Sequence, residues 1–223
     1  MDNNKKLIVR TYSSLQDYSY IFAAMQQFTA DRQDKPDEIW LLQHKPTYTQ
    51  GLAGKPEHIK RKLPFPLVKT DRGGQVTFHD AGQIMCYLLI DIKRKNLSII
   101  DLINKTESLI IAVLKDCGIT ATQNSELGRG IYIGQKKIAS IGLKVKKYCS
   151  YHGFALNFAT DITAFTYINP CGISNLQMTN IHDYENNFTP EQIHTKIIQH
   201  GRAQFEYDTL EIIRETNDVC TTK

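Results

Sequence analysis

The stretch that decides the fold is residues 130–158, GIYIGQKKIASIGLKVKKYCSYHGFALNF. Residues 131–133 are apolar and β-branched or aromatic, which is typical of a strand, and the turn Gly134-Gln135 follows them. Two longer segments with the same strand signals come next, Lys137–Val145 and Ser150–Phe158. Because only short connections separate the three segments, they predict an antiparallel meander.

Three helices are expected outside this stretch. The first is predicted over Ser14–Arg32, where large apolar residues recur at steps of three and four. The second begins after the cap Ser98 and runs to about Cys117, ahead of Gly118. The third follows Thr189-Pro190-Glu191-Gln192, a capping box with proline at the first helical position, and runs to about Phe205.

The remaining strands are short and do not alternate regularly with helices. They are expected at residues 7–12, 38–43, 67–69, 75–78 and 83–92, with a polar and mobile loop at 47–62. This order argues against a dinucleotide-binding fold or a barrel and predicts an α+β (mixed α/β) class. No linker divides the chain, so residues 1–223 are expected to form a single domain, with a frayed tail from about Glu215.

Composition narrows the class of protein. The chain has 223 residues, 41% hydrophobic and 22% charged, with a net charge of +4, which are values of an ordinary globular protein. No apolar run is long enough to span a bilayer, and the first residues lack the apolar core of a signal peptide, so we expect a cytoplasmic protein. Five cysteines without a C-x-x-C pair make a disulfide framework or a zinc site unexpected.

One cysteine differs from the others in its surroundings. Cys171 lies in Asn169-Pro170-Cys171-Gly172, a turn sequence that favours exposure, whereas Cys86 and Cys117 lie on apolar faces and are interpreted as core residues. A reactive cysteine also needs help to ionise, since a free thiol has a pKa of about 8.5. Cys171 is therefore a candidate nucleophile, and a purely structural turn cysteine is the alternative.

Lysine, glycine and histidine offer further candidates. Lys136 and Lys137 open a strand, so their side chains point to opposite sides and one of them can turn into a site. Arg72-Gly73-Gly74 matches no phosphate-binding motif; it is either a tight turn or a place where the backbone approaches a ligand. His79 and His152 can polarise a carbonyl or satisfy local backbone, and no metal-binding or G-x-S-x-G pattern accompanies them.

Five segments between Trp40 and Ser174 follow one another in an informative order. They are residues 49–51 with 53–59 (TQG, AGKPEHI), 71–79 (DRGGQVTFH), 137–142 (KIASIG), 152–157 (HGFALN) and 168–172 (INPCG). Each alone is weak, but the five in order are very specific. In this order the chain resembles the lipoyl(octanoyl) transferases, the acyltransferase family of lipoate biosynthesis.

The resemblance implies the catalytic fold of biotin and lipoate protein ligases and a two-step acyl transfer. An octanoyl group would leave octanoyl-acyl carrier protein, form a thioester on Cys171 and pass to a lysine of an apo lipoyl domain, with Lys137 as the paired base. The acceptors implied are lipoyl domains of 2-oxoacid dehydrogenase complexes and the glycine cleavage H protein. The family needs no cofactor, metal, nucleic acid or membrane, and we expect a monomer.

The acyl pocket maps by the same resemblance onto three segments. They are Arg72, Gly73, Gly74, Gln75, Val76, Thr77, Phe78 and His79; Ser140, Ile141 and Gly142; and Gly153, Phe154 and Ala155. Backbone N–H groups near Gly172 are expected to stabilise an oxyanion. After His79 the family usually has Gly-Pro-Gly-Gln, whereas this chain has Asp80-Ala81-Gly82-Gln83, which leaves the pocket edge and donor affinity open.

Three other functions remain to be compared with this one. An ATP-dependent ligase of the same fold would not need Cys171, and a cysteine thioesterase would use water in place of the acceptor lysine. A module that binds acyl carrier protein without catalysis would need neither Cys171 nor Lys137.

Overall fold

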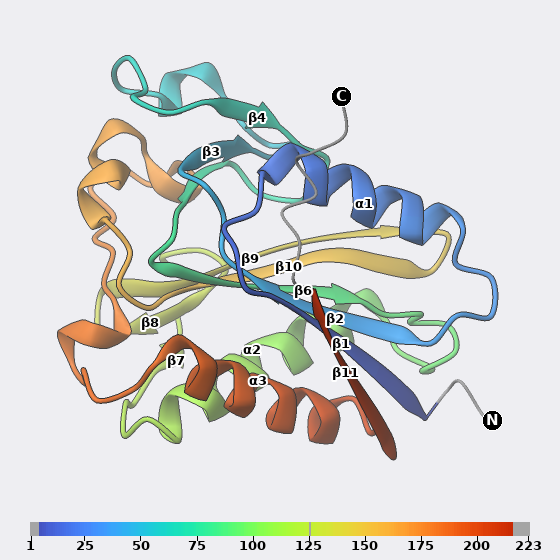
Figure 1. The fold of residues 1–223 in the computed structure, drawn as a ribbon. Helices are drawn as coiled ribbons and strands as arrows, with labels where there is room; N and C mark the ends of the chain where they lie inside the picture. Colours follow the sequence, from blue (N-terminus) through green and yellow to red (C-terminus); the bar gives the residue numbers. More distant parts are fainter. Residues whose placement is uncertain (1–4, 125, 216–223) are drawn as a thin grey trace.

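A mixed eight-stranded sheet forms the centre of the molecule. The computed structural model describes residues 5–124 and 126–215. The strand order is β11-β1-β2-β6-β10-β9-β8-β7 (Figure 1). The strands are β1 (Lys6–Tyr12), β2 (Asp37–Leu42), β6 (Gln83–Leu89), β7 (Thr122–Gln123), β8 (Ile131–Ile133), β9 (Lys136–Lys146), β10 (Cys149–Asn157) and β11 (Thr209–Glu215). β1 pairs in parallel with β2 and β11, and the other neighbours are antiparallel, which confirms the meander β8-β9-β10.

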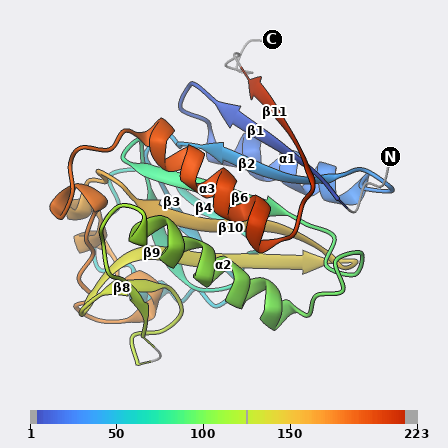
Figure 2. The same cartoon turned by 90° about the horizontal axis from the view of Figure 1, so that it is seen from below.

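Helices cover both faces of this sheet. α1 (Tyr18–Ala30) lies on one face, and α2 (Ile99–Lys115) and α3 (Pro190–Gln204) lie side by side on the other (Figures 1 and 2). The capping boxes predicted at Ser98 and Thr189 are both formed. The predicted start of α1 at Ser14 is wrong, because the Asp17 carboxylate accepts the N–H of Tyr20 at 3.1 Å and fixes the N-terminus there.

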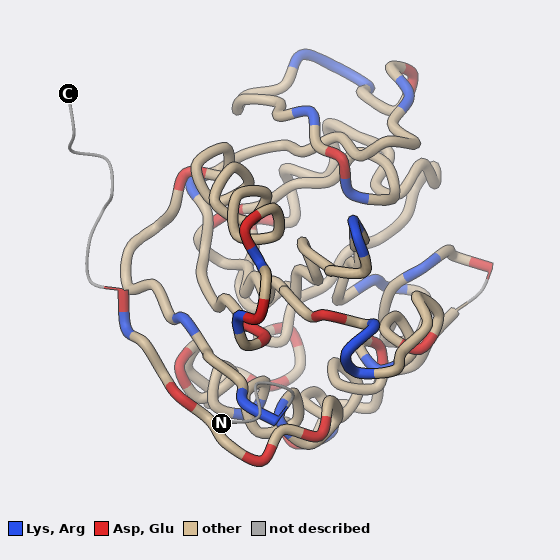
Figure 3. The backbone as a smooth tube through the Cα atoms, turned by 90° about the vertical axis from the view of Figure 1, so that its right-hand side faces the viewer, with Lys and Arg blue, Asp and Glu red and all other residues tan. Residues whose placement is uncertain are grey.

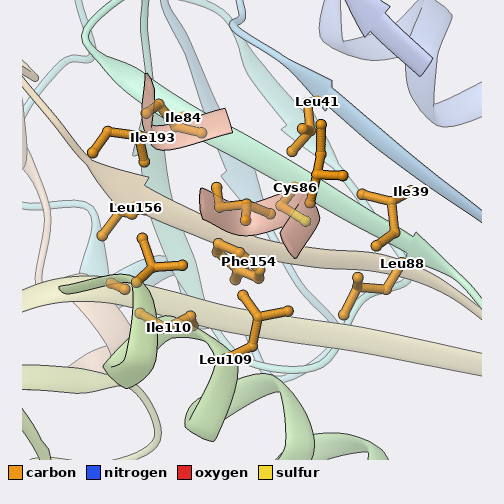
Figure 4. Packing of buried hydrophobic residues seen from close by; sticks show 14 of the residues in the cluster. Ile39, Leu41, Ile84, Cys86, Leu88, Leu109, Ile110, Phe154, Leu156 and Ile193 are labelled. Atoms are coloured by element: carbon orange, nitrogen blue, oxygen red, sulfur yellow. The ribbon is translucent and has the colours of Figure 1, made fainter. Parts of the chain in front are cut away.

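Strand alternation divides the apolar residues of β6 between two cores. Ile84, Cys86 and Leu88 face α2 and α3, where they pack with Phe154 and Ile193 (Figure 4). Met85, Tyr87 and Leu89 point to the other face and pack under α1. Both faces of the strand are therefore buried, which explains its continuous apolar sequence.

A second, three-stranded sheet lies at the side of the molecule that α1 covers (Figure 1). Its order is β4-β3-β5, with β3 at Thr47–Gln50, β4 at Leu67–Lys69 and β5 at Val76–His79. Short 3₁₀ turns complete the chain at Pro56–His58, Ile162–Tyr167, Pro170–Gly172 and Ile181–Asp183. The predicted loop over residues 47–62 is thus wrong at its start, because Thr47–Gln50 pairs with both neighbouring strands and is mostly buried.

The C-terminal strand was not expected from the sequence. Thr209–Glu215 lies at the sheet edge, where its positions are exposed or half-buried and none is fully buried. It joins the sheet through a full parallel register with β1, from Lys6↔Thr209 to Tyr12↔Glu215. The predicted frayed tail falls mainly on residues 216–223, which lie outside the described residues.

Charge is spread over the molecule. Basic and acidic residues are interspersed along the backbone (Figure 3), in keeping with the small net charge of +4. No α-helix within residues 5–124 and 126–215 combines the length and apolar character needed to cross a bilayer.

Candidate active site

Cys171 and Lys137 meet although they are distant in sequence. The Lys137 Nζ donates to the Cys171 Sγ at 2.9 Å and to the Arg129 carbonyl oxygen at 2.6 Å. The Lys137 side chain is fully buried at 0% exposure, whereas Lys136 is exposed, so the strand alternation expected for the two lysines is confirmed. The buried Lys137 amine thus has a carbonyl oxygen and the Cys171 sulfur as its hydrogen-bond partners.

The backbone holds these two side chains together. Lys137 N–H donates to the Gln177 carbonyl at 2.8 Å, and Thr179 N–H donates to the Lys137 carbonyl at 3.0 Å. The segment that follows Cys171 is thereby fastened to the start of β9. Cys171 itself has a φ of 57°, a left-handed conformation that costs energy for a side chain with a Cβ and is common at functional sites.

Two glycines make room around the pair. Gly130, at φ 146°, lies against the end of the Lys137 side chain, and a Cβ there would be 2.6 Å from the Ala139 carbonyl oxygen. Gly172, at φ 77°, lies against the side-chain amide of Gln75. The N–H of Gly172 donates to the Asn169 carbonyl at 2.9 Å, so the expectation that it serves an oxyanion is not supported.

A cavity of about 270 Å³ opens beside Cys171. It collects twelve of the fourteen residues predicted for the acyl pocket. They are Arg72, Gly74, Gln75, Val76, Thr77, His79, Ser140, Ile141, Gly142, Gly153, Phe154 and Ala155. The other two lie elsewhere: Phe78 packs against Tyr48 and Phe165 in the core of the small sheet, and Gly73 lines a neighbouring groove. Thr77 and His79 lie on the face of β5 opposite Phe78, whereas Val76 shares the face and the core of Phe78 and still borders the cavity.

Several lining residues were missed by sequence reasoning. They are Tyr18, Ala53, Met85, Tyr87, Gly128, Arg129 and His152, of which only His152 was singled out and without a defined place. Met85 and Tyr87 carried a usable signal, since alternation along β6 places them on the face opposite Ile84 and Cys86. No sequence pattern indicated that Tyr18 lines the cavity, because Tyr18 lies on α1, distant in sequence from the other lining residues.

A chain of buried hydrogen bonds runs from the backbone to His79. The Thr179 carbonyl can only accept, so it takes the Asn157 amide N–H at 3.0 Å and turns the Asn157 oxygen toward the Gln83 amide at 2.8 Å. Gln83 then presents its oxygen to His79 Nδ1 at 2.6 Å, which makes Nδ1 the donor. The orientations of the Asn157, Gln83 and His79 side chains therefore follow from the backbone carbonyl of Thr179.

The other ring nitrogen of His79 faces the cavity side of the small sheet. Burial lowers the pKa of His79 well below 6.5, and nearby His44 lowers it further, so the ring is neutral and Nε2 accepts from the Thr49 hydroxyl at 3.0 Å. The Thr49 hydroxyl in turn accepts from the Arg72 guanidinium at 2.8 Å. Arg72 is thereby fixed in the cavity wall, with a second bond to the Thr49 carbonyl at 2.9 Å.

A second histidine lines the cavity in a strained conformation. His152 has a φ of 59°, is buried, and bonds through Nε2 to the Asp71 carboxylate at 3.0 Å; its Nδ1 has no hydrogen-bond partner among residues 5–124 and 126–215. Burial opposes ionisation of Asp71, but the bonds from His152 and Tyr151 prevail and lower its pKa to about 2. Burial lowers the pKa of His152 in spite of Asp71, so the neutral ring donates from Nε2.

The unusual Asp80 lies outside this cavity. Its carboxylate accepts the N–H of Gly82 at 2.9 Å and the N–H of Asp161 at 2.9 Å, and burial raises its pKa. Asp80 therefore supports a turn and a second loop, and neither Asp80 nor Ala81 lines the cavity. No group of three His, Cys, Asp or Glu side chains in residues 5–124 and 126–215 is arranged to hold a metal ion.

Solved structures with the same fold define the class of protein. A putative lipoate protein ligase from T. acidophilum superimposes with a TM-score of 0.74 at 14% identity, covering 96% of this chain and 89% of the other. The biotin protein ligase from Aquifex aeolicus reaches 0.52 at 10% identity, covering 91% of this chain and 71% of the other. The predicted fold class is confirmed: this is the catalytic fold of lipoate and biotin ligases.

Sequence relatives place the chain within that class. A family profile described as "Lipoyl protein ligase A/B catalytic domain" matches residues 17–202. An octanoyltransferase from Coxiella burnetii (strain Dugway 5J108-111) is 47% identical over 95% of this chain and 87% of the relative. One from Legionella pneumophila (strain Corby) is 46% identical over 86% of this chain and 96% of the relative. The chain belongs to the lipoyl protein ligase A/B catalytic-domain family, and its activity is octanoyl transfer.

Proposed function

We propose that the enzyme moves an octanoyl group from octanoyl-acyl carrier protein to Cys171 and then to a lysine of an apo lipoyl domain. The observation that carries this mechanism is the 2.9 Å contact between the Lys137 Nζ and the Cys171 Sγ at the wall of the acyl cavity. The proposal takes residues 1–223 as one catalytic domain that acts in the cytoplasm as a monomer.

The first half-reaction exchanges one thioester for another. The Cys171 thiol gives its proton to Lys137, and the thiolate attacks the donor carbonyl. A carbon–sulfur bond to Cys171 forms and the bond to the carrier breaks. The departing carrier thiolate takes the proton back from Lys137, which leaves that amine neutral. Because both bonds are thioesters, the exchange is nearly isoenergetic and needs no ATP.

The second half-reaction forms an amide. The neutral amine of the acceptor lysine attacks the acyl carbon on Cys171, and Lys137 takes the proton that the attacking nitrogen loses. The carbon–sulfur bond then breaks and the proton returns to the Cys171 sulfur. Gln75 is our candidate to donate a hydrogen bond to the thioester oxygen, since its amide lies against Gly172 in the cavity wall.

The acceptors we propose are lipoyl domains of 2-oxoacid dehydrogenase complexes and the glycine cleavage H protein. One support is a solved structure of this fold, an archaeal bipartite lipoate protein ligase from Thermoplasma acidophilum described together with its E2 lipoyl domain, at a TM-score of 0.70. The sequence identity to that ligase is 12%, so the likeness extends to the fold alone and the acceptor is part of our proposal.

An intact-mass experiment tests the mechanism. The protein is incubated with octanoyl-acyl carrier protein, without ATP and without acceptor, beside a Cys171→Ser control. We expect one octanoyl group, released by hydroxylamine and absent from the control. Failure to find an adduct on the wild type would refute the covalent mechanism, and formation of octanoyl adenylate from free octanoate would favour a ligase. Rapid loss of the group to water would favour a thioesterase.

A further inference from the structure

A second cavity continues from the mouth of the acyl cavity. It has a volume of about 520 Å³, and both cavities are lined by Gly74, Arg129, Ile141 and Gly142. We name it the β9 groove, and its remaining lining residues are Leu52, Asp71, Gly73, Ile99, Ile103, Leu143, Lys144 and Val145. A molecule whose acyl end fills the first cavity can therefore extend into the β9 groove without leaving the protein surface.

One wall of the β9 groove is an open strand edge. β8 pairs with β9 only over Lys136–Ala139, and no strand in the described ranges pairs with the outer edge of β9 beyond that point. The Leu143 carbonyl accepts the N–H of Gly73 at 3.1 Å, so the backbone groups of Leu143 point outward. Because backbone direction alternates along a strand, those of Ile141 and Val145 point outward as well. The wall thus presents amide donors and acceptors to the groove.

Apolar and partly exposed side chains from two other elements also border the groove. Ile99 and Ile103 lie one turn apart on α2, and Leu52 lies on the loop after β3. Ile99 is 52% exposed and Leu52 is 67% exposed. Large apolar residues gathered at one exposed groove are typical of a binding surface.

Charge distinguishes the two ends of the groove. Arg129 borders both cavities and marks the end near Cys171, whereas Lys144 borders only the groove, in the outward direction along β9. Asp71 is the acidic residue in the lining, and its carboxylate is already bound by Tyr151, His152 and Gln26. The groove therefore combines amide groups, an apolar wall and a lysine.

We propose that the β9 groove binds the phosphopantetheine arm of the acyl donor, an inference that rests on the proposed function. This arm is a flexible chain with two secondary amides, a branched dimethyl carbon and a terminal phosphate. Its two amides lie about 5 Å apart, too close to span Ile141 and Val145, which are about 13 Å apart along β9, so the amide farther from the sulfur pairs with the outward groups of Val145 in the manner of an added strand. Its dimethyl carbon fits against Ile99 and Ile103, and its phosphate meets Lys144.

Two synthetic donors separate the groove from the acyl cavity. Octanoyl-phosphopantetheine carries the whole arm, whereas octanoyl-N-acetylcysteamine carries only the amide nearest the sulfur. Ile99→Glu places a carboxylate in the groove, and Ile100→Glu places one on the adjacent residue, which is 69% exposed and does not line it. Both substitutions fall in the first turn of α2, where an acidic residue favours the helix. The measured quantity is the rate of Cys171 acylation against donor concentration, read by intact mass.

We expect Ile99→Glu to raise the half-saturating concentration of octanoyl-phosphopantetheine about tenfold, the loss that corresponds to one buried aliphatic contact. The same variant should leave octanoyl-N-acetylcysteamine unchanged, and Ile100→Glu should change neither donor. Val145→Pro, which removes one outward N–H at an edge position, should also weaken only the full-length donor.

Other outcomes overturn the proposal in distinct ways. Equal effects on both donors would mean that Ile99 acts through the fold or the acyl cavity. A defect confined to transfer from acylated enzyme to the lipoyl domain would assign the groove to the acceptor protein. If neither donor acylates the wild type, the proposed function itself fails, and the groove assignment fails with it.

Discussion

Replacement of Lys137 by methionine tests the central contact of the site. Methionine is unbranched and similar in length, so Lys137→Met keeps the apolar stem within the buried channel beside Gly130 and removes the charge. Two bonds disappear, the 2.6 Å bond to the Arg129 carbonyl and the 2.9 Å bond to the Cys171 sulfur. We expect a large loss of activity with a small change in stability.

The expected change in the free energy of unfolding is the balance of two opposing effects. Leaving the Arg129 carbonyl without its donor costs about 1–3 kcal/mol. Methionine buries no polar group that needs a partner, which offsets part of this cost, so the free energy of unfolding should fall by no more than about 3 kcal/mol. Loss of a positioned acid and base should slow acylation of Cys171 by about 10²–10⁴-fold.

Two measurements separate the effect on activity from the effect on stability. Rapid-quench intact mass gives the acylation rate, and urea unfolding followed by tryptophan fluorescence gives the stability. Lys136→Met is the matched control, because Lys136 is the exposed neighbour on the same strand, and it should retain the wild-type rate. If Lys137→Met acylates within threefold of the wild-type rate while folded, roughly the scatter expected of a surface change, Lys137 is not the proton carrier.

Three further predictions follow from packing, burial and charge. Gly153→Ala places a methyl group into the Cys86 backbone and should lower the free energy of unfolding by about 1–3 kcal/mol in urea titration; Gly73→Ala, whose nearest neighbour is 3.6 Å away, should not. Burial lowers the pKa of His44 from 6.5 to about 4, so protons bind the unfolded chain first and stability should fall as the pH drops from 6.5 to 4, by at most about 1.4 kcal/mol per pH unit. His44→Asn should flatten that slope, and an unchanged slope would exclude His44 as its source. Replacing Lys144, Lys146 and Lys147 by glutamate should raise the apparent KM for octanoyl-acyl carrier protein, most strongly at low salt, if these lysines dock the acidic carrier. An unchanged KM, or an effect independent of salt, would mean that these three lysines take no part in docking the carrier.

Local pattern was sufficient for much of the framework. The meander of β8, β9 and β10, the capping boxes of α2 and α3 and the opposite directions of Lys136 and Lys137 all follow from spacing and residue type, and the structure has each of them. These features depend on contacts between residues a few positions apart. The order of the five motifs added the family, which the relatives confirm.

Features that depend on distant partners could not be predicted in this way. β3 looked like a loop because its sequence is polar, and it is a strand because β4 and β5 pair with it. β11 lies at the sheet edge with none of its positions fully buried, and its parallel register with β1 joins the two ends of the described chain. Phe78 lies within the binding motif but packs away from the cavity.

By itself, therefore, the sequence determined the family and which residues are candidates for the chemistry: a turn cysteine, a strand lysine and a glycine-rich motif in a fixed order. Only the tertiary structure decided that Cys171 and Lys137, 34 residues apart, meet at 2.9 Å, that Tyr18 and Tyr87 line the cavity, and that one carbonyl at Thr179 orients the chain to His79. The physical reason is that periodicity and caps record short-range geometry. The approach of two side chains depends on the packing and hydrogen bonds of the segments that carry them.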